Sequence, residues 1–145
     1  MTVIAWDGKT LATDSRETSG GTVTTDNNVK IKTIDVHYLG ERLLAIGFSG
    51  KSSACTVLLE NLSFPLEKGL EMSALIIGEH HLYELECGSI YPTQYNKKEH
   101  RAIGSGWVLA FSGMMLGLTA EESVKHAIKY NISCGGTVRK WEEKV

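Results

Sequence analysis

The first sixteen residues, MTVIAWDGKTLATDSR, constrain the fold of this chain more than any other stretch. Asp7-Gly8 stands between two short alternating runs, and Asp-Gly is a strong signal for a two-residue β-hairpin turn. The register of such a turn pairs positions 6 and 9, 4 and 11, and 2 and 13. The hairpin therefore returns the start of the chain to Asp14-Ser15-Arg16, with directly opposed Cβ atoms about 5 Å apart.

This hairpin would place a hydroxyl near the N-terminus beside a carboxylate and a guanidinium. Removal of Met1 would make Thr2 an N-terminal threonine, whose own α-amine can act as the base for its hydroxyl. Thr is also an ordinary strand residue, so the hairpin alone leaves both a catalytic and a structural interpretation open. Strict alternation puts Thr2 and Asp14 on opposite faces of an ideal ribbon. We therefore expect a bulge, a strong twist or a frayed end where the two side chains converge.

Length and composition predict one globular domain spanning residues 1–145, long enough to bury a core. The net charge of −2 and the lack of a basic run argue against a nucleic-acid partner. Three cysteines without metal-ligand spacing (Cys55, Cys87 and Cys134) fit free thiols in a reducing compartment. No segment approaches the roughly 20 apolar residues of a membrane span. The N-terminus also lacks the pattern of a signal peptide, so we expect no membrane association and a cytoplasmic location.

Hydrophobic periodicity predicts the remaining elements in order. Alternating or continuous apolar runs predict strands, and spacing of three and four residues predicts helices. The polar, glycine-bearing stretch 17–28 is typical of a surface loop or a weak hairpin. The predicted elements are two strands within 29–50, a helix at about 51–62 with Ala54, Val57, Leu58 and Leu62 on its apolar face, a connection at 63–72, a strand–turn–strand unit at 73–92 with its turn at Gly78–His81, and a strand leading from His100 into Ile103.

Two helices and a last strand are predicted in the final third of the chain. A helical stripe is assigned to the core and not to a cofactor site: it comprises Trp107, Phe111, Met114, Met115 and Leu118. Thr119 with Glu122 forms a capping box that begins the second helix, and residues 137–145 read as a short strand with a charged tail. The order of elements is typical of two sheets with helices outside, or of an α+β domain with helices on one face.

Adjacent His80 and His81 are the one histidine pair that could suggest a metal. Neighbouring residues on a turn, with no third ligand nearby, are more often solvated. We therefore predict no metal and no cofactor.

Six short motifs follow one another along the chain. They are Thr2-Val3-Ile4-Ala5; Ala12-Thr13-Asp14-Ser15-Arg16; Lys30, sixteen residues after Asp14; Phe48-Ser49-Gly50; Gly104-Ser105-Gly106; and Asn131-Ile132-Ser133-Cys134-Gly135-Gly136. In this order they resemble the proteasome β-subunit branch of the N-terminal nucleophile (Ntn) hydrolases, in particular the short versions of bacteria and phages. The resemblance covers nearly the whole chain. It implies an α+β fold, a four-layer αββα sandwich of two antiparallel sheets flanked by helices, and assembly into a homo-oligomeric ring.

The resemblance also implies a role for each matched residue. Thr2 Oγ1 would be the nucleophile and the Thr2 α-amine its proton acceptor. Lys30, paired with Asp14, would stabilise the alkoxide, although a slip of two residues would select Lys32 instead. Gly50 N–H would stabilise the oxyanion.

Three further residues receive roles in the same way. Ser105 would hydrogen-bond near the α-amine, and its ordinary alternative is an N-cap of the following helix. Phe48 and Ser49 would shape the substrate pocket.

Two positions depart from the family pattern. Asn131 stands where the family has an aspartate, and Cys134 stands where it has a serine. An amide supplies no negative charge, and a thiol is a weaker hydrogen-bonding group than a hydroxyl. Cys134 as the nucleophile ranks low because no pattern places a histidine near it. The interval between Thr2 and Asp14 and the segment after residue 62 are also shorter than in typical subunits.

Two functions from different classes follow. The first is a threonine-type amidohydrolase, a peptidase acting on peptide or protein substrates after Met1 removal, with an ATPase partner left open. The second is a catalytically inactive ring-forming scaffold or binding protein, for example a phage accessory factor. We favour the hydrolase because the set Thr2, Asp14, Lys30 and Ser105 is retained.

Overall fold

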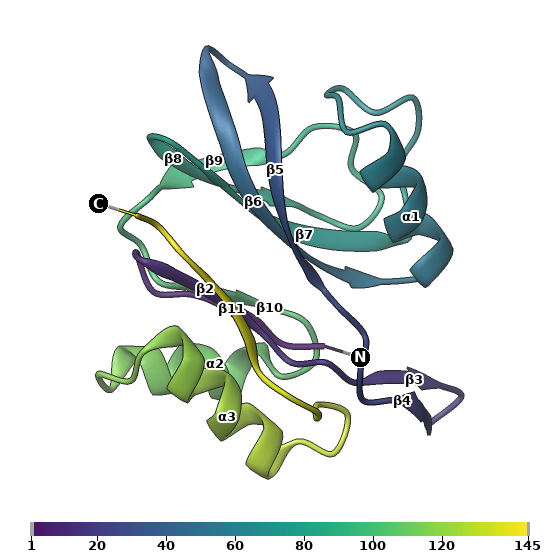
Figure 1. Cartoon of the computed structure of the whole chain (residues 1–145), viewed down its shortest axis with the longest axis vertical. Coiled ribbons are helices and arrows are strands. Elements are labelled where there is room, and N and C mark those ends of the chain that lie inside the picture. Colours follow the sequence, from purple (N-terminus) through teal and green to yellow (C-terminus); the bar gives the residue numbers. More distant parts are fainter. Residues whose placement is uncertain (1, 145) are drawn as a thin grey trace.

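The computed structural model describes residues 2–144 and consists of two antiparallel sheets packed face to face between outer helices (Figure 1). The smaller sheet has the strand order β10-β1-β2-β11, and the larger one has the order β5-β6-β7-β8-β9. Helix α1 covers the outer face of the larger sheet, whereas α2 and α3 cover the smaller one. The predicted four-layer αββα sandwich is confirmed.

The bounds of the elements follow the predicted order. The strands are β1 (Ile4–Trp6), β2 (Thr10–Thr13), β3 (Glu17–Ser19), β4 (Thr22–Thr25), β5 (Ile31–Tyr38), β6 (Glu41–Gly50), β7 (Met72–Gly78), β8 (His81–Leu85), β9 (Thr93–Asn96), β10 (Arg101–Ile103) and β11 (Arg139–Glu142). The helices are α1 (Ser52–Glu60), α2 (Trp107–Met115) and α3 (Ala120–Tyr130). None of these helices is long and apolar enough to cross a membrane.

Strands β1 and β2 lie at the centre of the fold and are buried on both faces. Ile4, Trp6 and Leu11 pack against the larger sheet, in a cluster between the two sheets. Ala5 and Ala12 point to the opposite side and pack against α2 and α3. Successive side chains of a strand point to opposite faces, so burial on both faces explains why the N-terminal segment is apolar at nearly every position. The start of the chain is therefore held rigidly in the core.

The predicted register of the first hairpin is wrong by two residues. Ile4 pairs with Thr13 and Trp6 pairs with Leu11, so the connection is longer than a two-residue turn. The cause is the side chain of Asp7, whose Oδ1 accepts hydrogen bonds from the N–H groups of Lys9 and Thr10. Asp commonly organises a turn in this way, by bonding backbone groups two and three residues further on.

Two predicted apolar helix faces are correct only in part. In α1 the buried residues are Ala54, Cys55 and Leu58, while Val57 is exposed. In α2 the stripe assigned to the core is wrong at two positions: Trp107 and Met115 are exposed, although Met114 is buried. The capping box of Thr119 and Glu122 is confirmed at the start of α3.

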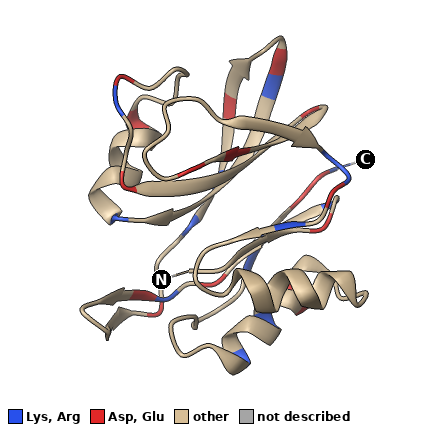
Figure 2. Cartoon of the chain, turned by 180° about the vertical axis from the view of Figure 1, so that it is seen from behind, with Lys and Arg blue, Asp and Glu red and all other residues tan. Residues whose placement is uncertain are grey.

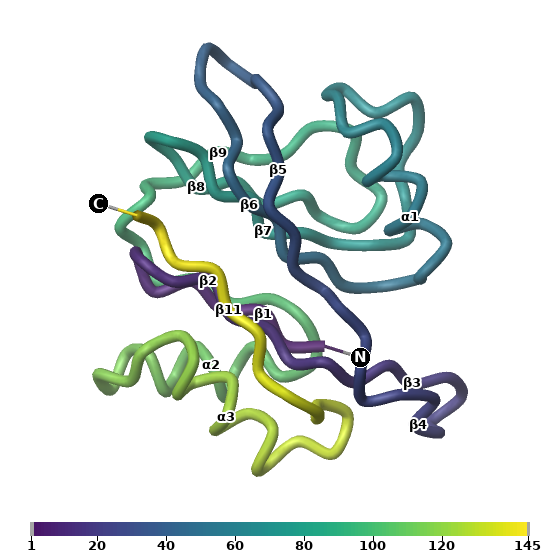
Figure 3. Tube along the Cα trace, in the orientation of Figure 1, coloured from purple at the N-terminus to yellow at the C-terminus, as the bar shows by residue number. Residues whose placement is uncertain are grey.

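The polar stretch 17–28 forms a hairpin of its own, β3–β4, beside the N-terminus of the chain (Figure 3). It pairs with neither of the two main sheets. Strand β9, which extends the edge of the larger sheet next to β8, was not predicted. His80 and His81 lie at the turn between β7 and β8, as predicted, and there they contact a buried carboxylate.

That carboxylate belongs to Glu41, the first residue of β6. Its Oε1 accepts from His80 N–H (2.8 Å), and its Oε2 contacts His81 Nδ1 (2.6 Å) and accepts from the Tyr83 hydroxyl (2.8 Å). Burial raises the pKa of the Glu41 carboxyl, but these hydrogen bonds outweigh burial and leave its pKa below the ordinary value of 4.5. Burial and the nearby Glu41 raise the pKa of Tyr83 to about 12. Glu41 thus joins the β7–β8 turn to the start of β6.

We expect Glu41→Gln to lower the free energy of unfolding by about 1–3 kcal/mol at neutral pH, because charge-assisted hydrogen bonds are lost from a buried site. A carboxyl whose pKa is lower in the folded state stabilises the fold above the unfolded pKa, and the contribution disappears as the pH falls through the folded value. The difference in free energy of unfolding between the wild type and Glu41→Gln should therefore become smaller below pH 4.5. Urea unfolding at several pH values measures it, with the exposed Glu60→Gln as the control. A gap independent of pH would contradict this account.

Candidate active site

Thr2 lies two residues before β1 and is held there through its own carbonyl group. The carbonyl oxygen accepts from the Gly106 N–H (3.3 Å) and from the Ser105 hydroxyl (3.4 Å). Both donors lie in the connection between β10 and α2. Strand β10 pairs with the edge of β1 that faces away from β2. Thr2 is 3% exposed, so its side chain has a defined position inside the molecule.

The side chain of Lys30 reaches this threonine. Lys30 Nζ lies 2.6 Å from Thr2 Oγ1 and 2.8 Å from Asp14 Oδ1, and it also donates to the carbonyl oxygen of Arg16. An ammonium group has three N–H donors, so it can bond to several oxygens at once. The Lys30 and Asp14 side chains are only 4% and 0% exposed, so the charge pair is screened little by solvent.

Asp14 joins three segments of the chain. Its Oδ1 accepts from Val3 N–H (3.3 Å) as well as from Lys30, and its Oδ2 accepts from Gly135 N–H (3.1 Å). Regular pairing between β1 and β2 ends at Ile4 and Thr13, just before this point. The side chain of Asp14 can therefore turn back toward the N-terminus. Lys30 contacts both Asp14 and Thr2, which strict alternation would put on opposite faces of the β1–β2 hairpin.

The position of Lys30 is set by the backbone just before β5. Its carbonyl accepts from the Phe48 N–H (2.9 Å), and Asn28 N–H donates to the Ser15 carbonyl (2.9 Å). Lys32 lies two residues later and is exposed. Of the two lysines left open by the sequence, Lys30 is the one in contact with Thr2.

Two hollows open beside Thr2 and Lys30. The first has a volume of about 240 Å³ and extends toward the helix α1. Its lining includes Thr2, Lys30, Val29, Phe48, Ser49, Gly50, Cys55, Thr56 and Leu59. The second, of about 830 Å³, shares the Thr2 and Lys30 end and runs between the hairpin β3–β4 and the start of α1. Its walls are mostly hydroxyl groups and backbone, with Glu17 bonded across it to Ser52.

Gly50 ends β6 at the mouth of both hollows. A Cβ at this position would lie 2.6 Å from Met72 Cα and 2.7 Å from the Glu71 carbonyl oxygen. Only glycine therefore allows β6 to approach β7 so closely at this point. Phe48 and Ser49 precede it and line the first hollow, where the sequence had placed a substrate pocket.

The late segment contacts the site through Ser105. Asn131 Nδ2 donates to the Ser105 carbonyl (3.2 Å), and Asn131 Oδ1 accepts from Ser133 N–H (2.9 Å). A carboxylate could not make the first of these bonds, because it has no donor. Asn131 thus holds two loops together, and the structure shows no contact between its side chain and Thr2.

Cys134 is buried beside Ser105 and Asp14. Burial raises the pKa of the Cys134 thiol above its ordinary value, and the charge of Asp14 raises it further, while a hydrogen bond with the Ser105 side chain acts in the opposite direction. Burial likewise raises the pKa of Cys55, in the wall of the first hollow. Both sulfurs are therefore thiols at neutral pH, and neither is an activated nucleophile.

The sequence missed one interaction that holds the site together. Arg16 Nε donates to Asp26 Oδ1 (2.8 Å), Nη2 donates to Asp26 Oδ2 (3.1 Å), and Nη1 donates to the Ile132 carbonyl (2.9 Å). The hydrogen bond from Arg16 lowers the pKa of Asp26. The arginine thereby joins the residue that follows β4 to the segment that carries Gly135, whose missing side chain leaves room for the guanidinium. The Asp-Ser-Arg motif placed Arg16 near the site but gave no sign of its partners.

Cys55, Thr56 and Leu59 of α1 were also missed as lining residues. The only signal was indirect: α1 begins directly after Phe48-Ser49-Gly50, so its first turns had to lie near the same hollow. Within residues 2–144, no group of three or more His, Cys, Asp or Glu side chains is placed to hold a metal ion.

No protein-family model matches this sequence, and neither does any curated protein. Solved structures do match over nearly the full chain. Eukaryotic HslV from Trypanosoma brucei is 17% identical, with a TM-score of 0.69 over 98% of this chain and 99% of that one. BPH from Thiobacillus denitrificans is 16% identical, with a TM-score of 0.70 over 99% and 98%. The structure of the same BPH in complex with epoxomicin is 17% identical, with a TM-score of 0.68 over 99% of this chain and 98% of that one. The chain therefore has the fold of the proteasome β-subunit-like Ntn hydrolases that its sequence resembles.

Proposed function

We propose that this protein is an N-terminal threonine amidohydrolase, a peptidase whose nucleophile is Thr2 Oγ1 once Met1 has been removed. Met1 lies outside the described residues. The observation that carries the proposal is the 2.6 Å contact between Lys30 Nζ and Thr2 Oγ1, with Asp14 at 2.8 Å behind the same nitrogen. The same ammonium that neutralises the buried Asp14 is thereby held against the threonine hydroxyl, where it would stabilise an alkoxide directly.

In the first step Thr2 Oγ1 attacks the carbonyl carbon of a peptide bond. The hydroxyl proton passes to the free α-amine of Thr2, directly or through water, because an α-amine titrates near neutrality. Lys30 Nζ, 2.6 Å from Oγ1, stabilises the developing negative charge on that oxygen. The carbonyl oxygen becomes an oxyanion, and we assign its stabilisation to the Gly50 N–H.

In the second step the tetrahedral intermediate collapses. The C–N bond breaks, the leaving amine takes the proton from the Thr2 ammonium, and the acyl group remains on Oγ1 as an ester. Water then attacks the ester carbonyl carbon and gives a proton to the same α-amine. The C–Oγ1 bond breaks, Oγ1 takes that proton back from the ammonium, and the acid leaves, which restores Thr2. Ser105 and Asn131 act as positioning residues in this scheme, since they hold the Thr2 carbonyl and the loop beside it.

The substrate pocket of the proposal is the hollow of about 240 Å³. Phe48, Cys55 and Leu59 give it apolar walls, so the side chain preceding the cleaved bond should be apolar. The longer hollow along β3–β4 has room for an extended chain. Assembly into a homo-oligomeric ring, an ATPase partner and a cytoplasmic location belong to the same proposal.

The test is the intact mass of freshly purified protein with and without epoxomicin or a β-lactone. We expect loss of Met1 and one adduct that maps to Thr2, and we expect Thr2→Ala to form none. Thr2→Ser should still react, because a serine hydroxyl occupies the same place. Absence of an adduct on protein that has lost Met1 would refute the proposal.

One observation favours the second candidate, an inactive scaffold. Asn131 gives its amide to the Ser105 carbonyl and brings no negative charge to the site. A protein that assembles normally but never reacts at Thr2 would be this scaffold, and the same mass experiment separates the two functions.

A further inference from the structure

The longer of the two hollows beside Thr2 carries charged side chains from several segments of the chain. Its walls include three cations, Arg16, Lys30 and Lys51, and one carboxylate, that of Glu17. In Figure 2 blue and red segments adjoin one another where the hairpin β3–β4 begins, next to the N-terminus. The charge that this hollow presents to a ligand therefore depends on which of these groups are already paired within the chain.

Each of the three cations has a carboxylate partner that is not itself in the walls of the hollow. The pairs are Arg16–Asp26 (2.8 Å), Lys30–Asp14 (2.8 Å) and Lys51–Glu71 (3.8 Å). The third pair is mostly exposed, so it is weaker than the other two. Three positive charges are thus offset by three negative charges before Glu17 is considered.

Glu17 has no cationic partner among residues 2–144. Its half-buried carboxylate accepts from the Ser52 hydroxyl on the other side of the hollow and lies 3.4 Å from the Thr24 hydroxyl. Both of these side chains are neutral. A carboxylate has about four acceptor sites, so two hydroxyls leave it able to bind a further donor. The hollow therefore carries one negative charge that the described chain does not offset.

The backbone fixes this carboxylate at the hollow. The pairing of β3 with β4 shifts directly after Glu17: Glu17 pairs with Thr25, whereas Thr18 pairs with Val23. A bulge of this kind changes the direction of the neighbouring side chain. Ser52, which holds the other end of the hydrogen bond, is the first residue of α1. The two sides of the hollow are thereby joined through Glu17.

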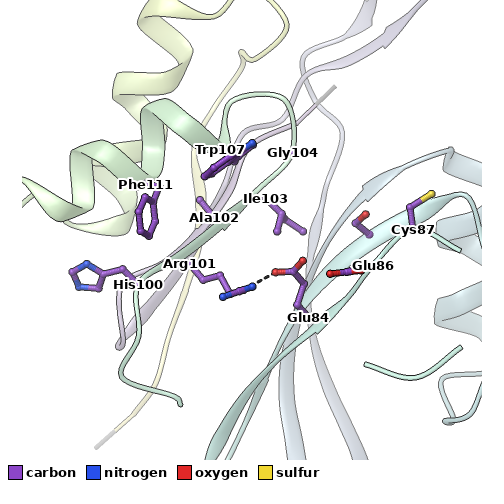
Figure 4. A pocket seen from close by; sticks show the side chains of 11 residues that line it. Glu84, Glu86, Cys87, His100, Arg101, Ala102, Ile103, Gly104, Trp107 and Phe111 are labelled. Carbon is purple, nitrogen blue, oxygen red and sulfur yellow. Dashed lines mark hydrogen bonds and ion pairs between the residues drawn. The ribbon is translucent and has the colours of Figure 1, made fainter. Parts of the chain in front are cut away.

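The groove beside Trp107 and Phe111 shows the opposite case. It has a volume of about 460 Å³, and Glu84 in its wall lies 2.6 Å from the Nε of Arg101 (Figure 4). An arginine of the chain itself thus occupies the Glu84 carboxylate. At Glu17 the equivalent place is taken by hydroxyl groups, so a guanidinium or ammonium group can come from a ligand.

We propose that Glu17 is a specificity-determining residue, which selects peptides with an arginine or lysine side chain in the longer hollow. This inference rests on the proposed function, because it names the substrate class of the same site. The two hollows share Thr2, Lys30 and Ser52, so one extended peptide can reach both.

The spacing of an extended chain sets the position of the basic side chain. Side chains two residues apart point to the same side of a strand and are about 7 Å apart. A peptide whose apolar side chain fills the first hollow therefore presents the side chain two residues away to the longer hollow. There its guanidinium forms a charge-assisted hydrogen bond with Glu17.

The first test is peptide binding to Thr2→Ala, in which the proposed nucleophile is absent and no peptide is cleaved. Two peptides are compared by isothermal titration calorimetry: acetyl-Arg-Ala-Leu-Ala-Arg-amide and its analogue with citrulline, which has the shape of arginine without the charge. The arginine peptide should bind about tenfold more tightly, as expected for hydrogen bonds to charged groups. This ratio should fall as salt is added. Equal affinity, or no binding of either peptide, would overturn the proposal.

The second test adds Glu17→Gln to the same protein. Glutamine can still accept a hydrogen bond from Ser52, so the link between the hairpin and α1 is kept while the charge is lost. The ratio of the two dissociation constants should fall to about one. Glu60→Gln, at the other end of α1, removes an exposed carboxylate and should keep the tenfold ratio of its parent. A Glu17→Gln protein that still prefers the arginine peptide would show that Glu17 serves structure alone.

These measurements need no turnover, so they separate the two proposals. Glu17-dependent binding of the arginine peptide, in a protein that never reacts with epoxomicin, would support the role of Glu17 and refute the proposed hydrolysis. An adduct at Thr2 together with equal affinity for the two peptides would do the reverse.

Discussion

Lys30→Met should slow the reaction of Thr2 with epoxomicin by about a thousandfold, the size of effect expected when a group that stabilises developing charge is removed. Methionine has nearly the same length as lysine but no ammonium, so Thr2 Oγ1 loses its 2.6 Å contact with positive charge. The second-order rate constant of adduct formation, followed by intact mass, measures the effect. Lys32→Met is the matched control, since Lys32 is exposed two residues away, and it should react at the wild-type rate.

The same substitution should also destabilise the fold, by about 3–5 kcal/mol, because it leaves the carboxylate of Asp14 buried without its partner. The double variant Asp14→Asn with Lys30→Met removes both charges and should recover part of this loss. It should not recover the reaction. Fast labelling of the double variant would mean that Lys30 serves stability alone, and the assignment of its catalytic role would be wrong.

Gly104→Ala should be among the most destabilising single substitutions in the chain. A Cβ at Gly104 would lie 2.0 Å from the Thr2 carbonyl oxygen, and the backbone there has a φ of +95°. Gly117, at the other end of α2, has a similar φ of +103° but empty space around it. The loss of stability in Gly117→Ala therefore reflects only the cost of placing alanine in a left-handed backbone conformation, about 1–2 kcal/mol. Gly104→Ala should cost about 3 kcal/mol more, because the N-terminal strand must also move.

The difference between the two alanine variants can be read in urea unfolding. The displaced Thr2 should further slow adduct formation in Gly104→Ala but not in Gly117→Ala. Equal losses of stability would mean that the Thr2 carbonyl can move away freely. The rigid placement of the N-terminal residue would then be wrong.

The sequence predicted the layers of the fold because the hydrophobic patterns of its long elements agree with their positions. Strand β6 and helix α3 are examples: β6 contains a continuous apolar run, and α3 has a clear helical period and its capping box. The register of the first hairpin could not be predicted in the same way. It depends on which backbone N–H groups the Asp7 side chain accepts from, and two-residue and longer turns share the same Asp-Gly signature.

The exposed stripe of α2 was misassigned for a related reason. Periodicity shows that Trp107, Phe111 and Met115 share a side of the helix, but it does not say whether that side meets the core or solvent. The pairing of Lys30 with Asp14 followed from a spacing in the resembled family. Val3 N–H and Gly135 N–H donate to Asp14, and Arg16 donates to the Ile132 carbonyl. These bonds depend on contacts between segments more than ten residues apart, which no local pattern encodes.

The hydrogen bonds around Thr2 also bear on whether the N-terminus is processed before or after the chain folds. The Thr2 carbonyl is held by Gly106 and Ser105, and the next N–H, that of Val3, is held by Asp14. A peptidase that frees the Thr2 amine from outside needs this stretch extended and accessible. If Thr2 is the nucleophile, as we propose, removal of Met1 is therefore expected before the N-terminal strand folds, so that processing competes with folding.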